Sequence, residues 1–150
     1  MENLSRKSAW NHEQLEHFLR STKIPARISV IDGSYPFICS VWFEYLEGTL
    51  RIVTHRNSKL AKSLRREGRC AFEVGANEPP YLGVRGKADV QAQNANPELT
   101  LRRVIERYLG DSNLNLATWL LGRAQEEIEF VLYPTWATCW DYQQRMDASD

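Results

Sequence analysis

The hydrophobic pattern changes from helical to strand-like near residue 26. Between residues 10 and 22 the apolar side chains of Leu15, Phe18 and Leu19 recur at helical spacing, which predicts an amphipathic helix. The Ile24-Pro25 pair follows directly. Since proline disfavours helical geometry in the residue before it, the helix is expected to end there.

Two segments rich in β-branched and aromatic residues come next, and each predicts a strand. They cover Arg27–Asp32 and Phe37–Tyr45, with Gly33 marking the turn between them. A Glu47-Gly48 turn then leads into a third strand, Thr49–Thr54. Because that turn is tight, the second and third strands are expected to form a hairpin.

A short helix and two more strands follow this hairpin. Ser58 can cap a helix that runs to Glu67, and Gly68 can terminate it. The next strands are expected at Arg69–Val74 and Tyr81–Gln91. Their order along the chain predicts an antiparallel meander.

The last third of the chain is helical at first and strand-like at the end. A helical region begins near Pro97, since proline suits a first turn, and Asn113–Leu121 continues it after a break at Gly110. Strands are expected at Glu127–Tyr133 and, after Pro134, at Thr135–Tyr142. The elements together predict an α+β chain, mainly β, built on an antiparallel sheet or barrel of six or seven strands with flanking helices.

The length and charge balance narrow the class of protein. A chain of 150 residues predicts a single domain, with an N-terminal helix over 1–23, a barrel over 24–142 that carries a helical insertion near 97–121, and a tail over 143–150. Nineteen basic and nineteen acidic residues cancel, which argues against a general nucleic-acid or membrane-surface binder. There is no apolar run of membrane-spanning length, no signal-like apolar stretch among the first fourteen residues and no disulfide framework, so we expect a cytoplasmic protein without membrane or nucleic-acid partners.

The neutral chain is polarised, because its basic residues gather between residues 51 and 69. This stretch carries seven basic side chains against the single Glu67, a local charge of plus six. Several of them, such as Lys62, Arg65 and Arg66, are typical of a solvated helix face. The basic residues are Arg51, Arg56, Lys59, Lys62, Arg65, Arg66 and Arg69.

Five residues of this stretch lie where a strand ends and a helix begins. Hydroxyl groups, helix N–H groups and two positive charges converge at such a junction, which is the geometry of a phosphate site. The same residue types are also common at ordinary helix starts, so the pattern leaves both interpretations open. The residues are Thr54, Arg56, Asn57, Ser58 and Lys59.

Other candidate chemistry has less support. Trp42 and Phe43 point to opposite faces of a strand, so one of them is expected in the core and the other is free to line a flat ligand. The histidines are not spaced as metal ligands, and the Glu126-Glu127 pair is expected on an exposed face. We predict no metal site, and a nucleic-acid-binding barrel lacks the compact alternation of aromatic and basic residues.

These segments, taken in order, resemble the pyridoxamine 5′-phosphate oxidase-like family of flavin-binding split barrels. The similarity covers roughly residues 24 to 142. It rests on an ordered set of segments, of which the strand Ile38-Cys39-Ser40-Val41-Trp42-Phe43, the helix start Asn57-Ser58-Lys59-Leu60 and the stretch Val84-Arg85-Gly86-Lys87-Ala88 are examples. The resemblance implies a six-stranded Greek-key split barrel that forms a homodimer, with flavin mononucleotide (FMN) at the subunit interface.

The resemblance also implies residue roles. Ser58 and Lys59 would grip the flavin phosphate, with Thr54 and Arg56 beside them. Another group, Ser40, Val41 and Trp42, would run alongside the isoalloxazine ring. Tyr81 stands where pyridoxamine oxidases carry a glutamine that faces the flavin, and the arginine and histidine that hold their substrate are missing.

The expected function is therefore an FMN-dependent oxidoreductase of unknown substrate, in which hydride or electron transfer runs through the flavin and a small molecule is the partner. Two alternatives remain on the same fold. One is a variant that uses the deazaflavin F420, and the other is a flavin, F420 or haem carrier without turnover.

Overall fold

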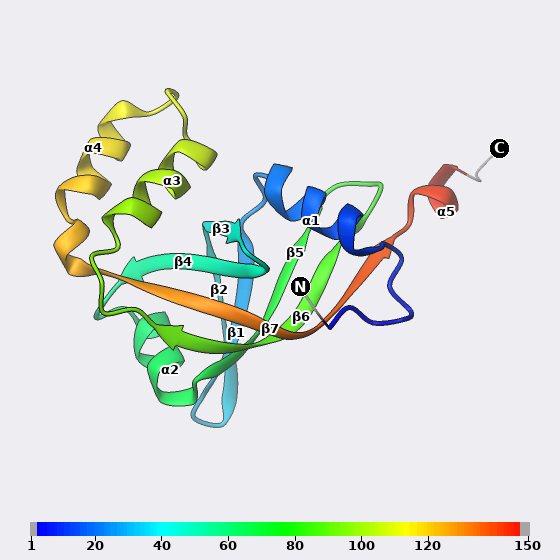
Figure 1. Ribbon diagram of the computed structural model, residues 1–150, viewed down its shortest axis with the longest axis horizontal. Coiled ribbons are helices and arrows are strands. Elements are labelled where there is room, and N and C mark those ends of the chain that lie inside the picture. The colour runs from blue at the N-terminus through cyan, green and yellow to red at the C-terminus, as the bar shows by residue number, and fades with distance from the viewer. Residues whose placement is uncertain (1–2, 148–150) are drawn as a thin grey trace.

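The computed structural model describes residues 3–147 as one curled antiparallel sheet flanked by helices (Figure 1). The strands are β1 (Ala26–Asp32), β2 (Tyr35–Val41), β3 (Phe43–Leu46), β4 (Thr49–His55), β5 (Arg69–Gly75), β6 (Leu82–Ala92) and β7 (Glu127–Asp141). The helices are α1 (His12–Ser21), α2 (Lys59–Glu67), α3 (Glu98–Tyr108), α4 (Leu114–Gly122), the 3-10 turn η1 (Ala124–Glu126) and α5 (Gln143–Asp147). The predicted tail thus includes α5, and its residues 148–150 lie outside the described part.

The sheet curls because one stretch of chain supplies both of its edges. The strand order is β2-β1-β5-β6-β7-β4-β3, so β2 and β3 are the outermost strands. Only Trp42 separates them in the sequence. The two edges must therefore lie close together, and the sheet forms a half-barrel rather than an open layer.

The predicted fold class is confirmed, but the structure has seven strands where the split-barrel expectation had six. The expected single strand Phe37–Tyr45 is broken at Trp42. Val41 pairs with Ala26 of β1, whereas Phe43 pairs with Ile52 of β4 at the other edge. Each half of the segment therefore belongs to a different side of the barrel.

The last two predicted strands are in fact one. The strand β7 runs without interruption through Pro134, opposite a register shift between Lys87 and Ala88 of β6. Proline has no N–H to donate to a ladder and is tolerated in a sheet at such irregularities. A sequence break at proline therefore did not mark the end of a strand here.

The barrel interior holds the main core, and helices close its ends. Its largest fully buried side chains include Phe43, Phe130 and Leu132 from the strands, together with Leu15 and Leu19 of α1. Leu60 and Leu64 attach α2 to the same core. A second, smaller cluster joins Leu101 and Ile105 of α3 to Ala124 of η1, and its other members are Val53, Leu109, Ala117, Leu120 and Leu121.

The acidic start of β7 differs from the expectation. Glu127 was predicted on an exposed face, but it is only 8% exposed, and Glu129 is 6% exposed. Each carboxylate is compensated by an arginine: Arg123 Nε lies 3.4 Å from Glu127, and Arg51 Nη1 lies 3.4 Å from Glu129. The prediction was wrong because the helical insertion and η1 cover this part of the sheet.

Within residues 3–147 we find no helix that combines the length and apolar character needed to cross a membrane.

Candidate cofactor site

The junction between β4 and α2 brings hydroxyl groups and a helix start together, as the sequence indicated. Ser58 is the N-cap of α2, and its Oγ accepts a hydrogen bond of 3.0 Å from the Ala61 N–H. Thr54 Oγ1, at the end of β4, lies 3.2 Å from Ser58 Oγ. The two hydroxyls are thus fixed beside the positive end of the helix dipole.

Lys59, the first residue of α2, adds a positive charge to this junction. Its Nζ lies 2.7 Å from Asp32 Oδ2 and 5.0 Å from the centre of the Phe37 ring. The hydrogen bond from Lys59 lowers the pKa of Asp32, and Arg66 Nη2 lies 3.5 Å from the same carboxylate. Two cations therefore share one anion, and the Lys59 side chain keeps 60% of its surface exposed. Glu67 also lies 2.9 Å from Arg66 Nε, so the four side chains balance in charge. The exposed Lys59 ammonium is the part of this group that an incoming anion can reach.

The edge strand β2 alternates between the core and the outside. Val41 packs against the barrel core, whereas Ser40 is exposed on the opposite face. Ile38, two residues before Ser40, lies on the same outer face and is 65% exposed. Of the residues expected along the ring, Ser40 is therefore the one that the outer face presents.

Trp42 has a partner that the sequence did not indicate. Its ring stacks on Tyr108 of α3, with centres 5.1 Å apart and planes only 7° from parallel. Phe43, the next residue, is fully buried. The expectation that one of these two aromatics belongs to the core is therefore confirmed, and one face of the other is covered by the helical insertion.

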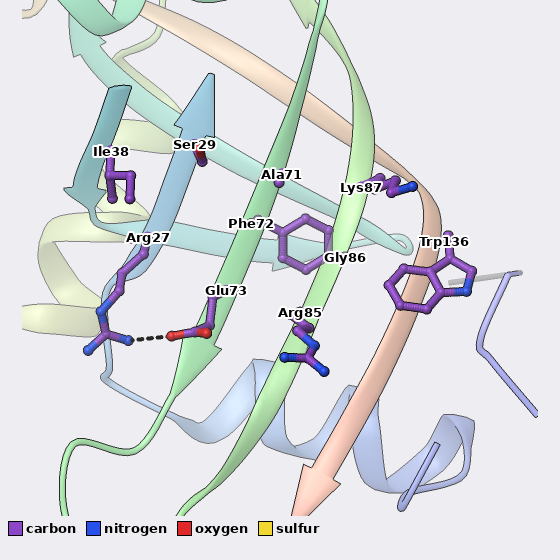
Figure 2. Close-up of a pocket in the computed structure, with 10 residues that line it drawn as sticks. All are labelled: Arg27, Ser29, Ile38, Ala71, Phe72, Glu73, Arg85, Gly86, Lys87 and Trp136. Carbon is purple, nitrogen blue, oxygen red and sulfur yellow. Dashed lines mark hydrogen bonds and ion pairs between the residues drawn. The ribbon is translucent and has the colours of Figure 1, made fainter. Parts of the chain in front are cut away.

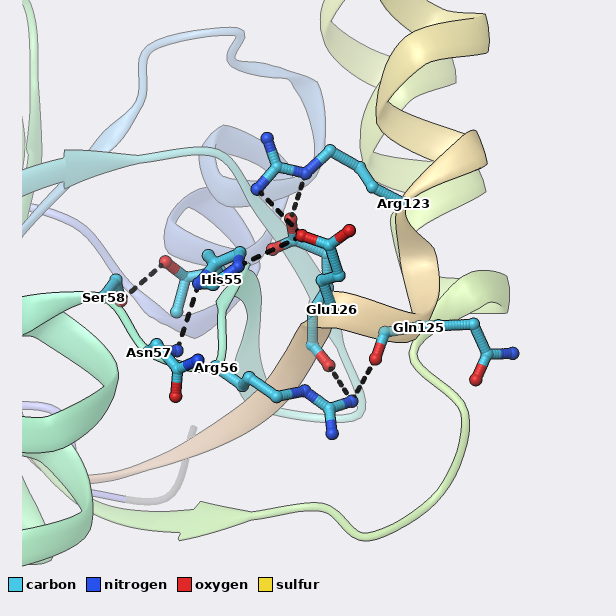
Figure 3. Close-up of polar contacts among 9 residues, drawn as sticks. His55, Arg56, Asn57, Ser58, Arg123, Gln125 and Glu126 are labelled. Carbon is cyan, nitrogen blue, oxygen red and sulfur yellow. Dashed lines mark hydrogen bonds and ion pairs between the residues drawn. The ribbon is translucent and has the colours of Figure 1, made fainter.

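Arg56 turns toward the opposite side of the junction (Figure 3). Arg56 Nη2 donates to the main-chain oxygens of Gln125 and Glu127, the latter at 3.2 Å. The Asn57 N–H donates to His55 Nδ1 at 3.1 Å, and His55 Nε2 lies 3.3 Å from Glu126. In Figure 3 the Arg56 side chain extends toward η1 and away from Ser58. The structure does not bring the Arg56 guanidinium together with Lys59.

Tyr81 lies far from this group within one chain. It precedes β6, and its carbonyl accepts from the Tyr142 N–H at 3.1 Å. The start of α2 belongs to the other end of the sheet. Lys59 pairs there with Asp32 at the end of β1, and the neighbouring strand β5 begins at Arg69 opposite Asp89, near the end of β6. Tyr81 is 41% exposed, and within one chain it takes no part in the α2 junction.

A hollow on the outer face of the sheet was not predicted as a site (Figure 2). It has a volume of about 350 Å³. Gly86 lies on its floor, and the missing side chain there leaves room on the core side for the Phe72 ring, which an added Cβ would approach to 2.6 Å. Arg27 Nη1 and Glu73 form a 3.3 Å ion pair at one side. The residues that line it are Arg27, Ser29, Ile38, Ala71, Phe72, Glu73, Arg85, Gly86, Lys87 and Trp136.

The strand period was the signal that could have found this hollow. Trp136 and Trp140 are four residues apart on one strand, so a period of two puts both on the same face, and they pair with Lys87 and Gly83 of β6. Alternate positions of β1, β5 and β6 point the same way. What the sequence did not reveal is which strands are neighbours, and so which of these side chains meet. Within residues 3–147 no group of three or more histidine, cysteine or acidic side chains is arranged to hold a metal ion.

No protein-family profile matches the chain, and no curated protein matches it by sequence. Solved structures do match. A conserved hypothetical protein from Mycobacterium tuberculosis superposes with a TM-score of 0.75 at 18% identity, over 96% of this chain and 92% of its own. A putative pyridoxamine 5′-phosphate oxidase from Listeria innocua gives a TM-score of 0.64 at 13% identity, over 87% and 97%. A structure named F420 reductase gives 0.61 at 16%, over 80% and 93%.

Identities below 20% establish the fold and nothing finer. The similarity extends over most of both chains in each of these comparisons, so it concerns the whole barrel and not a shared fragment. The sequence resemblance described above is confirmed at this level: the chain has the split-barrel fold of pyridoxamine 5′-phosphate oxidase-like proteins.

Proposed function

We propose that the chain is a cytoplasmic FMN-dependent oxidoreductase that acts as a homodimer on a small-molecule substrate. The observation that carries the proposal is the β4–α2 junction, where Thr54, Ser58 and Lys59 offer two hydroxyls, a helix start and a reachable positive charge. A phosphate group on the cofactor fits such a junction. The fold shared with a putative pyridoxamine 5′-phosphate oxidase supports the choice of a flavin.

The neighbouring residues support the placement of the ring. The exposed Ser40 lies on the edge strand β2, to which Phe37 next to Lys59 also belongs. A flavin anchored by its phosphate at Lys59 would lie with its ring along this strand, beside Ser40, Val41 and Trp42. Arg56 and Asn57 would contribute through the turn that positions Ser58, because the Arg56 guanidinium and the Asn57 N–H both make hydrogen bonds elsewhere.

The separation of the proposed residues supports a homodimer. Tyr81 and the α2 junction lie at opposite ends of the sheet in one chain. Tyr81 can therefore complete a site only if it comes from a second copy. The exposed outer face, with Ile38 and Trp136 beside the hollow, provides an apolar surface on which that copy can pack.

When bound, the flavin would supply hydride or electron transfer. The chain's own residues would bind the phosphate, orient the ring and shield one side of it from water. This division of labour is consistent with a sequence that offers no arranged triad or metal site.

The test is reconstitution of the purified full-length chain with FMN. We expect bound flavin to be visible by its absorbance and by quenching of its fluorescence, and Lys59→Ala to weaken binding at least tenfold, since a charge-assisted hydrogen bond to phosphate is lost. Lys62→Ala is the matched control, because Lys62 is exposed on the same helix. A wild-type chain that takes up no flavin would contradict the proposal.

The alternatives predict different outcomes of the same experiment. A deazaflavin enzyme, as the structure named F420 reductase makes reasonable, would prefer F420 to FMN in direct competition. A carrier of flavin, F420 or haem would retain its cofactor but show no reduction by NADH or NADPH.

A further inference from the structure

We propose that a second cavity, between α2 and the helical insertion, binds a small organic anion that carries a carboxylate or phosphate group. The cavity has a volume of about 330 Å³, and seven of its ten lining residues have polar or charged side chains. Neither Ser58 nor Lys59 lines it. The proposal therefore does not depend on the cofactor site described above.

Two arginines are held in place at this cavity by main-chain oxygens. Arg56 uses Nη2 to reach the carbonyls of Gln125 and Glu127, as Figure 3 shows. Arg65 Nη1 donates to the Arg56 carbonyl at 2.9 Å. A guanidinium has five N–H donors, so each arginine keeps donors for a ligand after making these bonds. The carbonyls orient the two cations before any ligand arrives.

The charge balance of the cavity favours an anion. Glu127 is the one acidic residue in its lining. That carboxylate is 8% exposed and lies 3.4 Å from Arg123 Nε, so its charge is already compensated from outside the cavity. Arg56 and Arg65 stay protonated at any physiological pH. The net effect is a positive field in a confined polar space.

The size and the remaining side chains define the class of ligand. A volume of about 330 Å³ is near the lower limit for small-molecule sites. The amides of Asn94, Asn96 and Gln125 offer both donors and acceptors. An oxygen-rich anion of a few carbon atoms matches this lining, whereas a large apolar molecule does not.

The cavity also joins two parts of the fold. Arg56 and Arg65 belong to the barrel and α2, whereas Asn94, Asn96 and Gln125 flank the helical insertion. A ligand that contacts both sides would hold them together. Because it binds only the folded state, it would raise the melting temperature of the chain with increasing concentration.

The experiment titrates citrate and inorganic phosphate, at constant ionic strength, into the full-length Lys59→Ala variant. This variant lacks the lysine proposed to bind the cofactor, so binding at that site does not contribute to the measurement. We expect saturable heat by calorimetry, together with shifts of the side-chain amide resonances of Asn94, Asn96 and Gln125. Arg65→Gln should weaken binding about tenfold, since one charged hydrogen-bond partner is lost. Lys62→Gln, on the same helix but outside the cavity, should not change it.

Two results would overturn the proposal: heat that never saturates, or equal weakening by Arg65→Gln and Lys62→Gln. Failure here is distinguishable from failure of the proposed function. In an otherwise wild-type chain, Arg65→Gln should leave FMN binding unchanged, whereas Lys59→Ala should lose FMN and keep citrate. Circular dichroism of each variant checks that it is folded.

Discussion

Glu127 shows how much a single residue depends on what covers it. Strand alternation directs its side chain away from the side of the core-facing Ile128, and from the sequence alone this predicts exposure to solvent. In the structure the η1 turn and the end of α4 lie over that face, and Arg123 compensates the charge at 3.4 Å. The sequence contains both residues but not their packing. A charge on the outer side of a strand is exposed only where no other element crosses it.

The burial of Glu127 predicts a dependence of stability on pH. Desolvation raises the pKa of Glu127 above its ordinary value of 4.5, although the charges of Arg123 and His55 act to lower it. A carboxyl with a raised pKa binds more protons in the folded state than in the unfolded state at pH values between the two pKa values. Its contribution to stability is therefore most unfavourable at neutral pH and is relieved as the pH falls toward 4.5.

The variant Glu127→Gln tests this directly. It removes the charge but keeps the shape of the side chain. The quantity to compare is the free energy of unfolding of the wild type minus that of the variant, and this difference should rise as the pH falls from 7 to 4. Urea unfolding at several pH values measures it. Glu98→Gln is the control, because the Glu98 side chain at the start of α3 keeps 39% of its surface exposed and pairs with the exposed Arg102. A difference in the free energy of unfolding that stays constant with pH would show that burial does not raise the pKa of Glu127.

Arg56 marks the limit of prediction at the residue scale. The sequence placed it correctly at the β4–α2 turn, beside Thr54 and Ser58, whose hydroxyls do meet. Its guanidinium turns away because carbonyls near residue 126 accept its hydrogen bonds. Those carbonyls lie about 70 positions further along the chain. No local pattern contains that information, whereas the helix cap depends on neighbours only and was predicted.

At the scale of elements, local signals were reliable where one residue decides the backbone. Ser58 caps α2, and Gly68 ends it with a positive φ of 63°, which glycine adopts without strain. The break at Trp42 has no such signal, because the residues on both sides are good strand formers. It results from pairing with two different edges of the sheet. Tertiary pairing therefore decided where one predicted strand became two.

The break at Trp42 is held by α3, and this predicts a role for Tyr108. Its ring stacks on Trp42, and its hydroxyl accepts from the Phe43 N–H at 3.4 Å and donates to the Ile24 carbonyl at 3.3 Å. Tyr108→Ala should lower the free energy of unfolding by about 2 kcal/mol, since it removes a half-buried aromatic pair.

Tyr108→Phe separates the two contributions. It keeps the stack and loses two long hydrogen bonds, so its effect should stay below about 1 kcal/mol. Urea denaturation gives both values, and hydrogen exchange of α3 amides shows whether the helix detaches from the barrel first. If the alanine and phenylalanine variants were equally destabilised, the hydroxyl and not the stack would hold the break.

At the scale of the whole molecule, the sequence predicted an antiparallel sheet or barrel, and the family resemblance a split barrel, but neither predicted how the surface is used. The neutral chain carries an exposed lysine, Lys59, at the β4–α2 junction and a separate pair of arginines at the neighbouring cavity. The outer face adds a third feature, an apolar hollow bordered by charges. All three depend on which strands are adjacent, and adjacency in an antiparallel sheet is set by long-range packing. Sequence periodicity supplies only the list of outward side chains.

The outer face predicts how two copies associate. Ala71 lies exposed on β5 in the hollow, between Ser29 of β1 and Lys87 of β6. Ala71→Arg would place a long charged side chain there without entering the barrel core. Because an exposed strand position tolerates arginine, the variant should fold with nearly unchanged stability. It should nevertheless dissociate a dimer that packs through this face, since the added charge would lose its hydration in the interface.

Sedimentation velocity distinguishes these states. The wild type should sediment with the mass of two 17.4 kDa chains, and Ala71→Arg with the mass of one. Gln91→Arg adds the same charge at an exposed position of β6 outside the hollow and should remain dimeric. Since Tyr81 can reach the α2 junction only from a second copy, the monomeric variant should also bind FMN more weakly. A wild type that is monomeric at every concentration would remove Tyr81 from the site and leave Lys59, Ser58 and Ser40 to hold the cofactor alone.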